Sequence, residues 1–251
     1  MSDSTTRFSN RVADYVKYRP HYPAAIVDYL EEQGVLGAGA HIADLGSGTG
    51  ISSLLFLNRG YSVKGVEPNK DMREKSIELL QGFPDFEAVD GTAEHTTLPS
   101  RSVDMVIAGQ AFHWFNRSET RKELGRIIIP GGAVVLIWNE RLVDTGFERA
   151  YEDLIIQYGR QYLQVDHRNT DHHAIQQFFE PNEVICKQFD NQQVFDYAGL
   201  EGRLLSSSYM PTRTDPGFGD MVRELKELFE RFHDGGKITV HYTTKLYFSR
   251  V

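Results

Sequence analysis

A loop with glycine at alternate positions follows a short apolar segment, and it constrains the fold more than any other feature. The segment reads His41-Ile-Ala-Asp-Leu-Gly-Ser-Gly-Thr-Gly50. Because glycine has no Cβ, the backbone at Gly46, Gly48 and Gly50 can approach a ligand closely. Glu67 ends a second apolar segment, and a carboxylate about twenty positions after such a loop is well placed to accept hydrogen bonds from a ribose. The loop and the acid together predict a nucleoside-binding site.

Apolar segments of strand length alternate with helical segments from His41 onward. We expect strands at 42–45, 61–66, 86–89, 103–108 and 132–138, and helices at 51–58, 71–80 and 117–128. This alternation predicts right-handed βαβ units, and hence a parallel sheet.

The flanking segments follow a different pattern. Two helices are expected before the loop, at 8–18 and 23–33. After Glu140 we expect helices at 147–162, 200–206 and 218–232, strands at 186–195 and 237–248, and a polar loop at 166–173. The prediction is one α/β domain over residues 1–251, a Rossmann-like, doubly wound, mostly parallel seven-stranded sheet. Residues 1–40 form an N-terminal helical lid, 41–140 the cofactor-binding core, and 141–251 complete the sheet and cap the substrate.

Composition excludes several classes of partner. The formal net charge is −8, with 35 acidic against 27 basic residues and no run of Lys or Arg, which argues against nucleic-acid binding. No apolar run approaches the ~20 residues needed to span a bilayer, and the first residues lack the apolar region of a secretory signal. A single cysteine, Cys186, fits a reducing compartment. We therefore expect a cytoplasmic protein, monomeric or homodimeric.

The loop also discriminates between nucleoside cofactors. A dinucleotide fingerprint places its third glycine where this chain has Ile51. Asp44, two residues before the first glycine, is poorly placed beside a pyrophosphate but suits a cationic ligand such as an α-ammonium group. The residues favour a nucleoside that carries an amino acid, and an NAD-binding oxidoreductase remains the alternative.

The motif set resembles the class I S-adenosylmethionine-dependent methyltransferases, whose glycine loop has the form D/E-x-G-x-G-x-G. Asp44-Leu-Gly-Ser-Gly-Thr-Gly50 fits that form at every defined position. The resemblance implies S-adenosylmethionine as cofactor, and it also implies a set of cofactor-binding residues. These are Asp44, Gly46, Gly48, Glu67 for the ribose, Thr92, Ala93 and Glu94 around the adenine, and Gln110 at the end of the fourth strand.

The chain looks most similar to the small-molecule branch that includes ubiquinone-pathway and trans-aconitate methyltransferases. The aromatic pattern from Phe8 to Tyr22 and the run Gln110-Ala-Phe-His-Trp-Phe115 carry this resemblance. The same run departs from the (N/D)-P-P-(Y/F) motif of nucleic-acid and protein amide N-methyltransferases. The resemblance implies methyl transfer to a small organic acceptor at oxygen or carbon; a non-catalytic cofactor-binding regulator with this fold is a further alternative.

Methyl transfer requires positioning more than a dedicated catalytic group, so the sequence indicates pocket residues more clearly than a catalyst. Gln110, Phe112, His113, Trp114 and Phe115 are the pocket candidates beyond the fourth strand. His113 is the candidate general base because its ordinary pKa lies near neutrality, although it could equally pack a helix start.

A second group of candidate substrate-binding residues lies in the expected lid. Tyr18 and Arg19, together with Trp114, are predicted to bind the substrate. Arg19 could pair with an acceptor carboxylate through two parallel hydrogen bonds, or could equally cap a helix end. If Arg19 pairs with a carboxylate, the favoured acceptor is a small carboxylic acid that is methylated on oxygen.

We expect structural roles for most of the remaining polar and sulfur side chains. His167, His172 and His173 lie on a polar loop without metal-ligand spacing, so no metal site is predicted. Cys186 is expected in the core. Tyr209, Met210 and Arg213 could line the acceptor pocket or pack the core.

Overall fold

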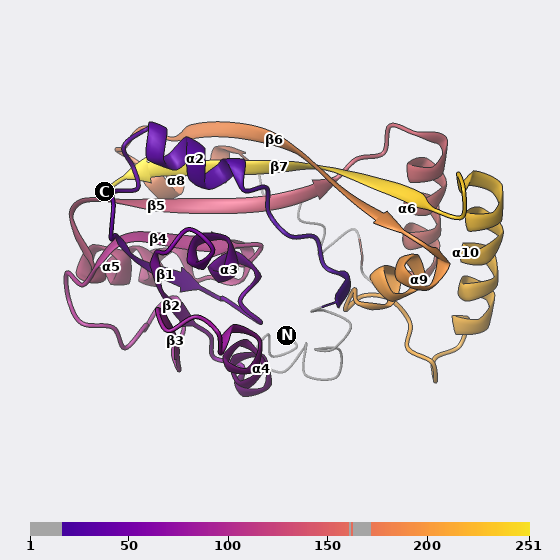
Figure 1. Ribbon diagram of the computed structural model, residues 1–251, viewed down its shortest axis with the longest axis horizontal. Coiled ribbons are helices and arrows are strands. Elements are labelled where there is room, and N and C mark those ends of the chain that lie inside the picture. Colours follow the sequence, from indigo (N-terminus) through magenta and orange to yellow (C-terminus); the bar gives the residue numbers. More distant parts are fainter. Residues whose placement is uncertain (1–16, 161, 163–171) are drawn as a thin grey trace.

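Seven strands form a single sheet in the computed structural model, which describes residues 17–160, 162 and 172–251 (Figure 1). The strand order is β3-β2-β1-β4-β5-β7-β6, and β7 is antiparallel to both of its neighbours. The strands are β1 (His41–Leu45), β2 (Ser62–Val66), β3 (Phe86–Val89), β4 (Val103–Gly109), β5 (Ile128–Arg141), β6 (Ile185–Phe195) and β7 (Ile238–Arg250). The predicted doubly wound, mostly parallel seven-stranded sheet is confirmed.

The helices connect these strands in the alternation that the sequence predicts. The described α-helices are α2 (Ala25–Glu32), α3 (Ile51–Leu57), α4 (Lys70–Leu80), α5 (Arg117–Ile127), α6 (Gly146–Tyr158), α8 (His172–Phe179), α9 (Tyr197–Leu205) and α10 (Phe218–Phe232). Most of the helix predicted over 8–18 lies outside the described residues.

Two hydrophobic cores cover the two faces of the sheet. Side chains alternate between faces along a strand, so Ile42 and Ala43 of β1 belong to different cores. Ile26 of α2 and Phe56 of α3 pack on the first face. Helices α5 and α8 cover the second face, where Phe178 joins the core. A sheet buried on both sides explains why its central strands read as continuous apolar runs.

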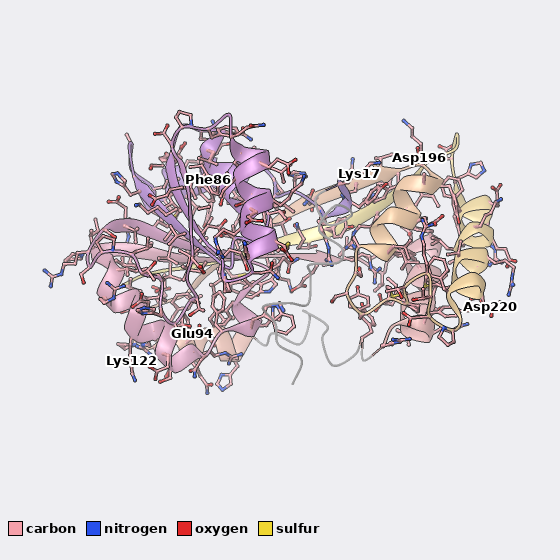
Figure 2. The ribbon with its side chains drawn as sticks, turned by 90° about the horizontal axis from the view of Figure 1, so that it is seen from below. Lys17, Phe86, Glu94, Lys122, Asp196 and Asp220 are labelled. Carbon is pink, nitrogen blue, oxygen red and sulfur yellow. The ribbon has the colours of Figure 1, made fainter. Side chains whose placement is uncertain are left out.

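A third core lies outside the α/β body. Strands β5, β6 and β7 run beyond the body and carry a helical cap made of α6, α9 and α10 (Figure 1). Tyr151, Leu200 and Leu225, one from each cap helix, are almost fully buried there. Figure 2 shows the body and the cap from below, with Lys17 labelled where they meet. The long strands therefore hold the cap at a fixed place beyond the carboxyl end of β5.

Three expectations for the second half of the chain are corrected. Cys186 is exposed, not buried in the core, because β6 is the edge strand and most of its side chains face solvent. His172 and His173 begin helix α8 where a polar loop was expected; His167 lies outside the described residues. Strand β5 is twice the predicted seven residues, at 14, because it already begins at Ile128, which pairs with Val103 of β4, and because Asn139 to Arg141 continue its pairing with β7.

Candidate functional site

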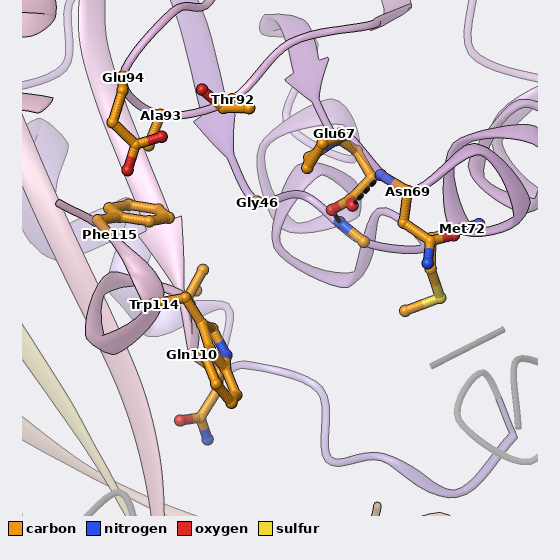
Figure 3. A pocket seen from close by; sticks show the side chains of 14 residues that line it. Gly46, Glu67, Asn69, Met72, Thr92, Ala93, Glu94, Gln110, Trp114 and Phe115 are labelled. Atoms are coloured by element: carbon orange, nitrogen blue, oxygen red, sulfur yellow. Dashed lines mark hydrogen bonds between the residues drawn. The ribbon is translucent and has the colours of Figure 1, made fainter. Parts of the chain in front are cut away.

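A pocket opens at the carboxyl ends of β1, β2, β3 and β4 (Figure 3). Strand order reverses between β1 and β4, and ligands of open α/β sheets bind at such switch points. The lining residues come from the end of β4 and from the segments that follow the four strands. They are Gly46, Gly48, Glu67, Pro68, Asn69, Met72, Thr92, Ala93, Glu94, Gly109, Gln110, Ala111, Trp114 and Phe115.

The glycine loop lines the pocket with backbone at two of its three glycines. Gly46 has φ +66°, and a Cβ there would lie 2.7 Å from the Cβ of Ala111. Gly48 also has a positive φ, and its N–H points to the Glu67 side chain. Gly50 does not line the pocket, contrary to expectation. A Cβ at Gly50 would instead lie 2.5 Å from a methyl of Leu80, so this glycine allows close packing of α3 against α4.

Glu67 links the second strand to the glycine loop. Its Oε2 accepts a hydrogen bond from the Gly48 N–H at 2.9 Å, and its Oε1 accepts one from the Asn69 N–H at 2.8 Å. Burial raises the pKa of Glu67, and these two hydrogen bonds partly oppose that shift. Each carboxylate oxygen keeps a further lone pair, so Glu67 can still accept hydrogen bonds from a vicinal diol.

Asp44 lies behind the glycine loop, outside the pocket lining, and is completely buried. Its Oδ2 accepts hydrogen bonds from Ser52 at 2.6 Å and from Ser53 at 2.7 Å, both at the start of α3. Burial raises the pKa of Asp44 to about 7, although both serines lower it. The other oxygen, Oδ1, has no hydrogen-bond partner among the described residues. A cationic group on the pocket side of the loop would relieve this buried carboxylate.

A tight turn after β3 forms the opposite wall. The backbones of Thr92 and His95 pair with each other, which closes the turn around Ala93 and Glu94. Glu94 Oε1 accepts a hydrogen bond from the backbone N–H of Asn116 at 2.8 Å, which fixes the turn against the start of α5. Thr92, Ala93 and Glu94 therefore lie together on one side of the pocket.

Gln110 follows β4 in a strained backbone conformation. Its φ of +57° is unusual for a residue with a Cβ, and such strain is concentrated at functional sites. The side-chain Nε2 donates to the backbone oxygen of Asn139 on β5 at 3.0 Å. Its Oε1 is buried and has no hydrogen-bond partner among the described residues. Gln110 thus lines the pocket and also contacts the strand that leads to the cap.

The aromatic run after Gln110 divides between pocket and core. Trp114 and Phe115 line the pocket, and Trp114 is 40% exposed. Phe112 was a pocket candidate, but it packs in the second core with its ring 4.7 Å from that of Phe178. His113 does not line the pocket. Its ring stacks obliquely on Trp114 and both ring nitrogens are buried, so a base role would require His113 to move.

The segment before α2 joins the pocket to the cap. Gln193 of β6 donates to the backbone oxygen of Tyr18, and the Tyr18 ring packs against Gly202 of α9. Arg19 Nη2 donates to the backbone oxygen of Ser206 at 3.2 Å. Four residues later, the Tyr22 hydroxyl lies 2.7 Å from the position that a Cβ on the pocket-lining Gly109 would take. Tyr15, which belongs to the aromatic pattern from Phe8 to Tyr22 that the sequence shows, lies outside the described residues.

Several lining residues were not identified from the sequence. Pro68, Asn69 and Met72 follow Glu67, and Asn69 caps α4 by accepting a hydrogen bond from the Met72 N–H at 3.0 Å. An asparagine directly before a helical pattern was the available signal. Conversely, the expected contribution of the cap helices is not found, since none of the pocket-lining residues comes from α6, α9 or α10.

Other candidate residues have structural surroundings. Met210 is buried in the cap core, Tyr209 packs against Tyr162, and Arg213 is exposed. Among the residues that the structure describes, no cluster of three or more His, Cys, Asp or Glu side chains could hold a metal ion. Within the same residues, no helix has the length and apolarity to cross a bilayer.

Part of the chain is similar to known proteins. Residues 43–136 match the model of a methyltransferase domain. An uncharacterised methyltransferase of Mycobacterium tuberculosis is 33% identical over 153 residues, which cover 61% of this chain and 60% of the relative. The match with this relative thus spans less than two thirds of either protein.

Solved structures share the fold along nearly the whole chain. A proposed type II methyltransferase from Anaeromyxobacter dehalogenans superposes with a TM-score of 0.71 at 22% identity, covering 93% of this chain and 97% of that one. A geranyl diphosphate C-methyltransferase from Streptomyces coelicolor, solved with S-adenosyl-L-homocysteine, has a TM-score of 0.51 at 14% identity, covering 91% of this chain and 76% of the other. The chain thus has the Rossmann-like fold of these solved methyltransferases, and its residues 43–136 match a methyltransferase domain.

Proposed function

We propose that this protein transfers a methyl group from S-adenosylmethionine to a small organic acceptor. The observation that carries the proposal is the convergence of the glycine loop, Glu67, the Thr92–Glu94 turn and Gln110 on one pocket at the switch point of the sheet. Each of these parts follows a different strand, and their order along the chain is that of the family motifs.

The donor groups of the pocket suit this cofactor. Glu67 offers carboxylate oxygens to the ribose hydroxyls, and Ala93, only 4% exposed, gives the adenine an apolar contact. The buried Asp44 and the unpaired Gln110 Oε1 favour an ammonium group at the other end. Two carboxylates near the glycine loop disfavour a pyrophosphate, which makes NAD a poor fit.

The chain's own residues would hold and orient the reactants. When bound, the cofactor supplies a methyl group on a sulfonium centre: the nucleophile forms the new bond, and the electrons of the broken S–CH3 bond stay on sulfur. Trp114 and Phe115 can attract the positive sulfonium through their ring faces and exclude water. Much of the rate then comes from alignment of donor and acceptor. His113 as a general base and Tyr18, Arg19 and Trp114 as substrate-binding residues remain part of the proposal.

A turnover assay tests the proposal. The protein is incubated with S-adenosylmethionine and a panel of small carboxylic acids and phenols, and S-adenosylhomocysteine is quantified. We expect at least one acceptor to raise its formation above the acceptor-free rate. Glu67→Ala should abolish the increase, whereas Glu87→Ala, an exposed carboxylate on β3, should not. Tight binding of the cofactor without turnover for any acceptor would instead favour a non-catalytic regulator.

A further inference from the structure

A cluster of arginine and tyrosine side chains lies inside the cap, away from the pocket lining. Arg203, in the last turn of α9, donates from Nε to the Tyr242 hydroxyl at 3.3 Å and from Nη1 to the Ser207 hydroxyl at 3.3 Å. The phenol groups of Tyr151 and Tyr209 also lie close enough to interact electrostatically with its guanidinium. The immediate surroundings of Arg203 are therefore hydroxyl groups.

The cluster has an excess of positive charge. Arg141 of β5 forms an ion pair with Glu152 of α6, and its guanidinium lies 4.9 Å from the centre of the Tyr151 ring. Arg203 makes no ion pair with any carboxylate of the described residues. A partly buried cation that is satisfied only by neutral hydroxyls is costly unless an anion joins it. Among the described residues, the charge of Arg141 is therefore paired with Glu152, whereas that of Arg203 is not paired with a carboxylate.

The Tyr242 hydroxyl is oriented so that it accepts a hydrogen bond from Arg203. The Tyr242 hydroxyl donates to Gln193 Oε1 at 2.9 Å, so its lone pairs face the guanidinium. Gln193 in turn donates to the backbone oxygen of Tyr18. The planar guanidinium of Arg203 is thus held in place by neutral partners and can still form a bidentate pair with a planar anion.

The chain connects this cluster to the pocket over a short distance. Tyr18 packs against α9, one residue before Arg203, and Tyr22 reaches the pocket-lining Gly109. Four residues span at most about 14 Å even when fully extended. Strand β5 makes the same connection: Gln110 bonds to the backbone oxygen of Asn139, and Arg141 lies two residues, roughly 7 Å, further along. Two short stretches of chain therefore join the methyl-donor side of the pocket to the cap.

We infer that Arg203, supported by Tyr242 and Ser207, binds a carboxylate of the methyl acceptor, so that the enzyme acts on organic acids. This inference rests on the proposed function and deepens it. The atom that receives the methyl group belongs to another part of the acceptor, on the Gln110 side. A carboxylate suits Arg203, because its two oxygens match the planar guanidinium, which pairs with no carboxylate of the described residues.

Binding measurements with matched acids and amides test the inference. The protein is saturated with S-adenosylhomocysteine and titrated calorimetrically with benzoate, fumarate and succinate, and with the corresponding amides. We expect at least one acid to bind at least tenfold more tightly than its amide. Arg203→Met should weaken the binding of that acid at least tenfold, and Tyr242→Phe should weaken its binding by a smaller factor. Arg231→Met, an exposed arginine of the same cap, should leave the affinity unchanged.

Several outcomes would overturn the inference. It fails if no acid binds the wild-type protein at 20 mM, if Arg203→Met binds the acid as the wild type does, or if methyl phosphate binds more tightly than every carboxylate. The affinity for S-adenosylhomocysteine, measured in the same variants, reports whether Arg203→Met is folded. If Arg203→Met is not folded, Arg203→Lys takes its place. We expect the same loss of acid affinity in Arg203→Lys, because lysine lacks the planar guanidinium fork. Failure of the wild type to bind S-adenosylhomocysteine would instead count against the proposed function.

Discussion

Gly46 combines two requirements that other residues cannot meet together. Its φ of +66° is left-handed, and a Cβ would approach Ala111 to 2.7 Å. A left-handed conformation alone costs a residue with a Cβ about 1–2 kcal/mol. The loop is therefore built around a glycine at the point where it lines the pocket.

Substitution of Gly46 should affect the cofactor site more than the fold. We expect Gly46→Ala to weaken the affinity for S-adenosylhomocysteine at least about tenfold, which equals about 1.4 kcal/mol, because the loop must move away from Ala111. Calorimetric titration measures this change. Gly37→Ala is the matched control, since no atom lies within 4 Å of its added Cβ. Equal affinities of the two variants would contradict this view of the loop.

Asp44 makes stability depend on pH around neutrality. Burial raises its pKa from 3.8 to about 7, so the folded protein holds a proton that the unfolded chain releases across this interval. The free energy of unfolding contributed by Asp44 therefore falls as pH rises from about 4 to 7, by an amount on the order of 3 kcal/mol.

Replacement of this carboxyl should remove that dependence. We expect the unfolding free energy of Asp44→Asn, from urea denaturation, to change less between pH 5 and pH 8 than that of the wild type. Relative to the wild type, the variant gains stability as pH rises. Asp153→Asn, an exposed change on α6, should behave as the wild type. A wild-type difference between the two pH values that persists in Asp44→Asn would show that another group is responsible.

At the scale of whole elements, α6 begins at a capping box whose glutamate, Glu148, is buried. Thr145 Oγ1 accepts a hydrogen bond from the Glu148 N–H at 3.1 Å, and Glu148 Oε2 accepts one from the Thr145 N–H at 2.9 Å. Glu148 Oε1 also bonds to His241 of β7 at 2.8 Å. One carboxylate thus joins the first turn of α6 to the strand that carries the cap.

The charge on Glu148 should stabilise the fold above its unfolded pKa. Burial alone would raise the pKa, but hydrogen bonds from Thr145, His241 and Asp144 hold it below the ordinary value of 4.5. We expect Glu148→Gln to lower the unfolding free energy at pH 7 by about 1.5–3 kcal/mol, as for hydrogen bonds to a charged group.

The pH dependence of this effect follows from the lowered pKa. The difference between Glu148→Gln and the wild type should shrink as pH falls below 4.5, because the wild-type carboxylate then becomes protonated. Urea denaturation at pH 7 and pH 4 measures it, with Glu227→Gln on the exposed face of α10 as control. A difference that stays constant between the two pH values would mean that the charge of Glu148 is not what matters.

Elements of the α/β body were predictable because local pattern and global fold agree there. Strand β3 begins and ends at the predicted residues, as α10 of the cap also does, and β1, α3 and α4 differ by one residue at an end. Strand β6 was placed correctly, but the exposure of Cys186 was not, because its position at the sheet edge depends on β7, about fifty residues away. Register and strand order of this kind are not encoded in local periodicity.

The candidate site was predictable to a similar degree and for a similar reason. Gly46, Glu67 and Gln110 carry their signal in short motifs, and all three line the pocket. Phe112 and Trp114 are nearly adjacent in sequence, yet one is buried and the other lines the pocket, because the short 3-10 helix Phe112–Trp114 turns them in different directions. The place of Arg203 depends on contacts with β7 and with the segment before α2, which no motif reports.

At the scale of the whole molecule, one continuous sheet runs through the body and the cap, and each of the two parts has hydrophobic cores of its own. The body supplies every residue of the pocket lining, and the cap supplies the excess positive charge. The segment 18–22 and the long strand β5 connect the two. We therefore expect the body to select the methyl donor and the cap to select the acceptor.

The central claim is that the pocket binds S-adenosylmethionine, and titration with S-adenosylhomocysteine tests it most directly. We expect one binding site, affinity reduced at least about tenfold by Glu67→Ala and unchanged by Glu87→Ala, and no binding of NAD. Absence of S-adenosylhomocysteine binding at 1 mM ligand, or tighter binding of NAD than of S-adenosylhomocysteine, would contradict the claim.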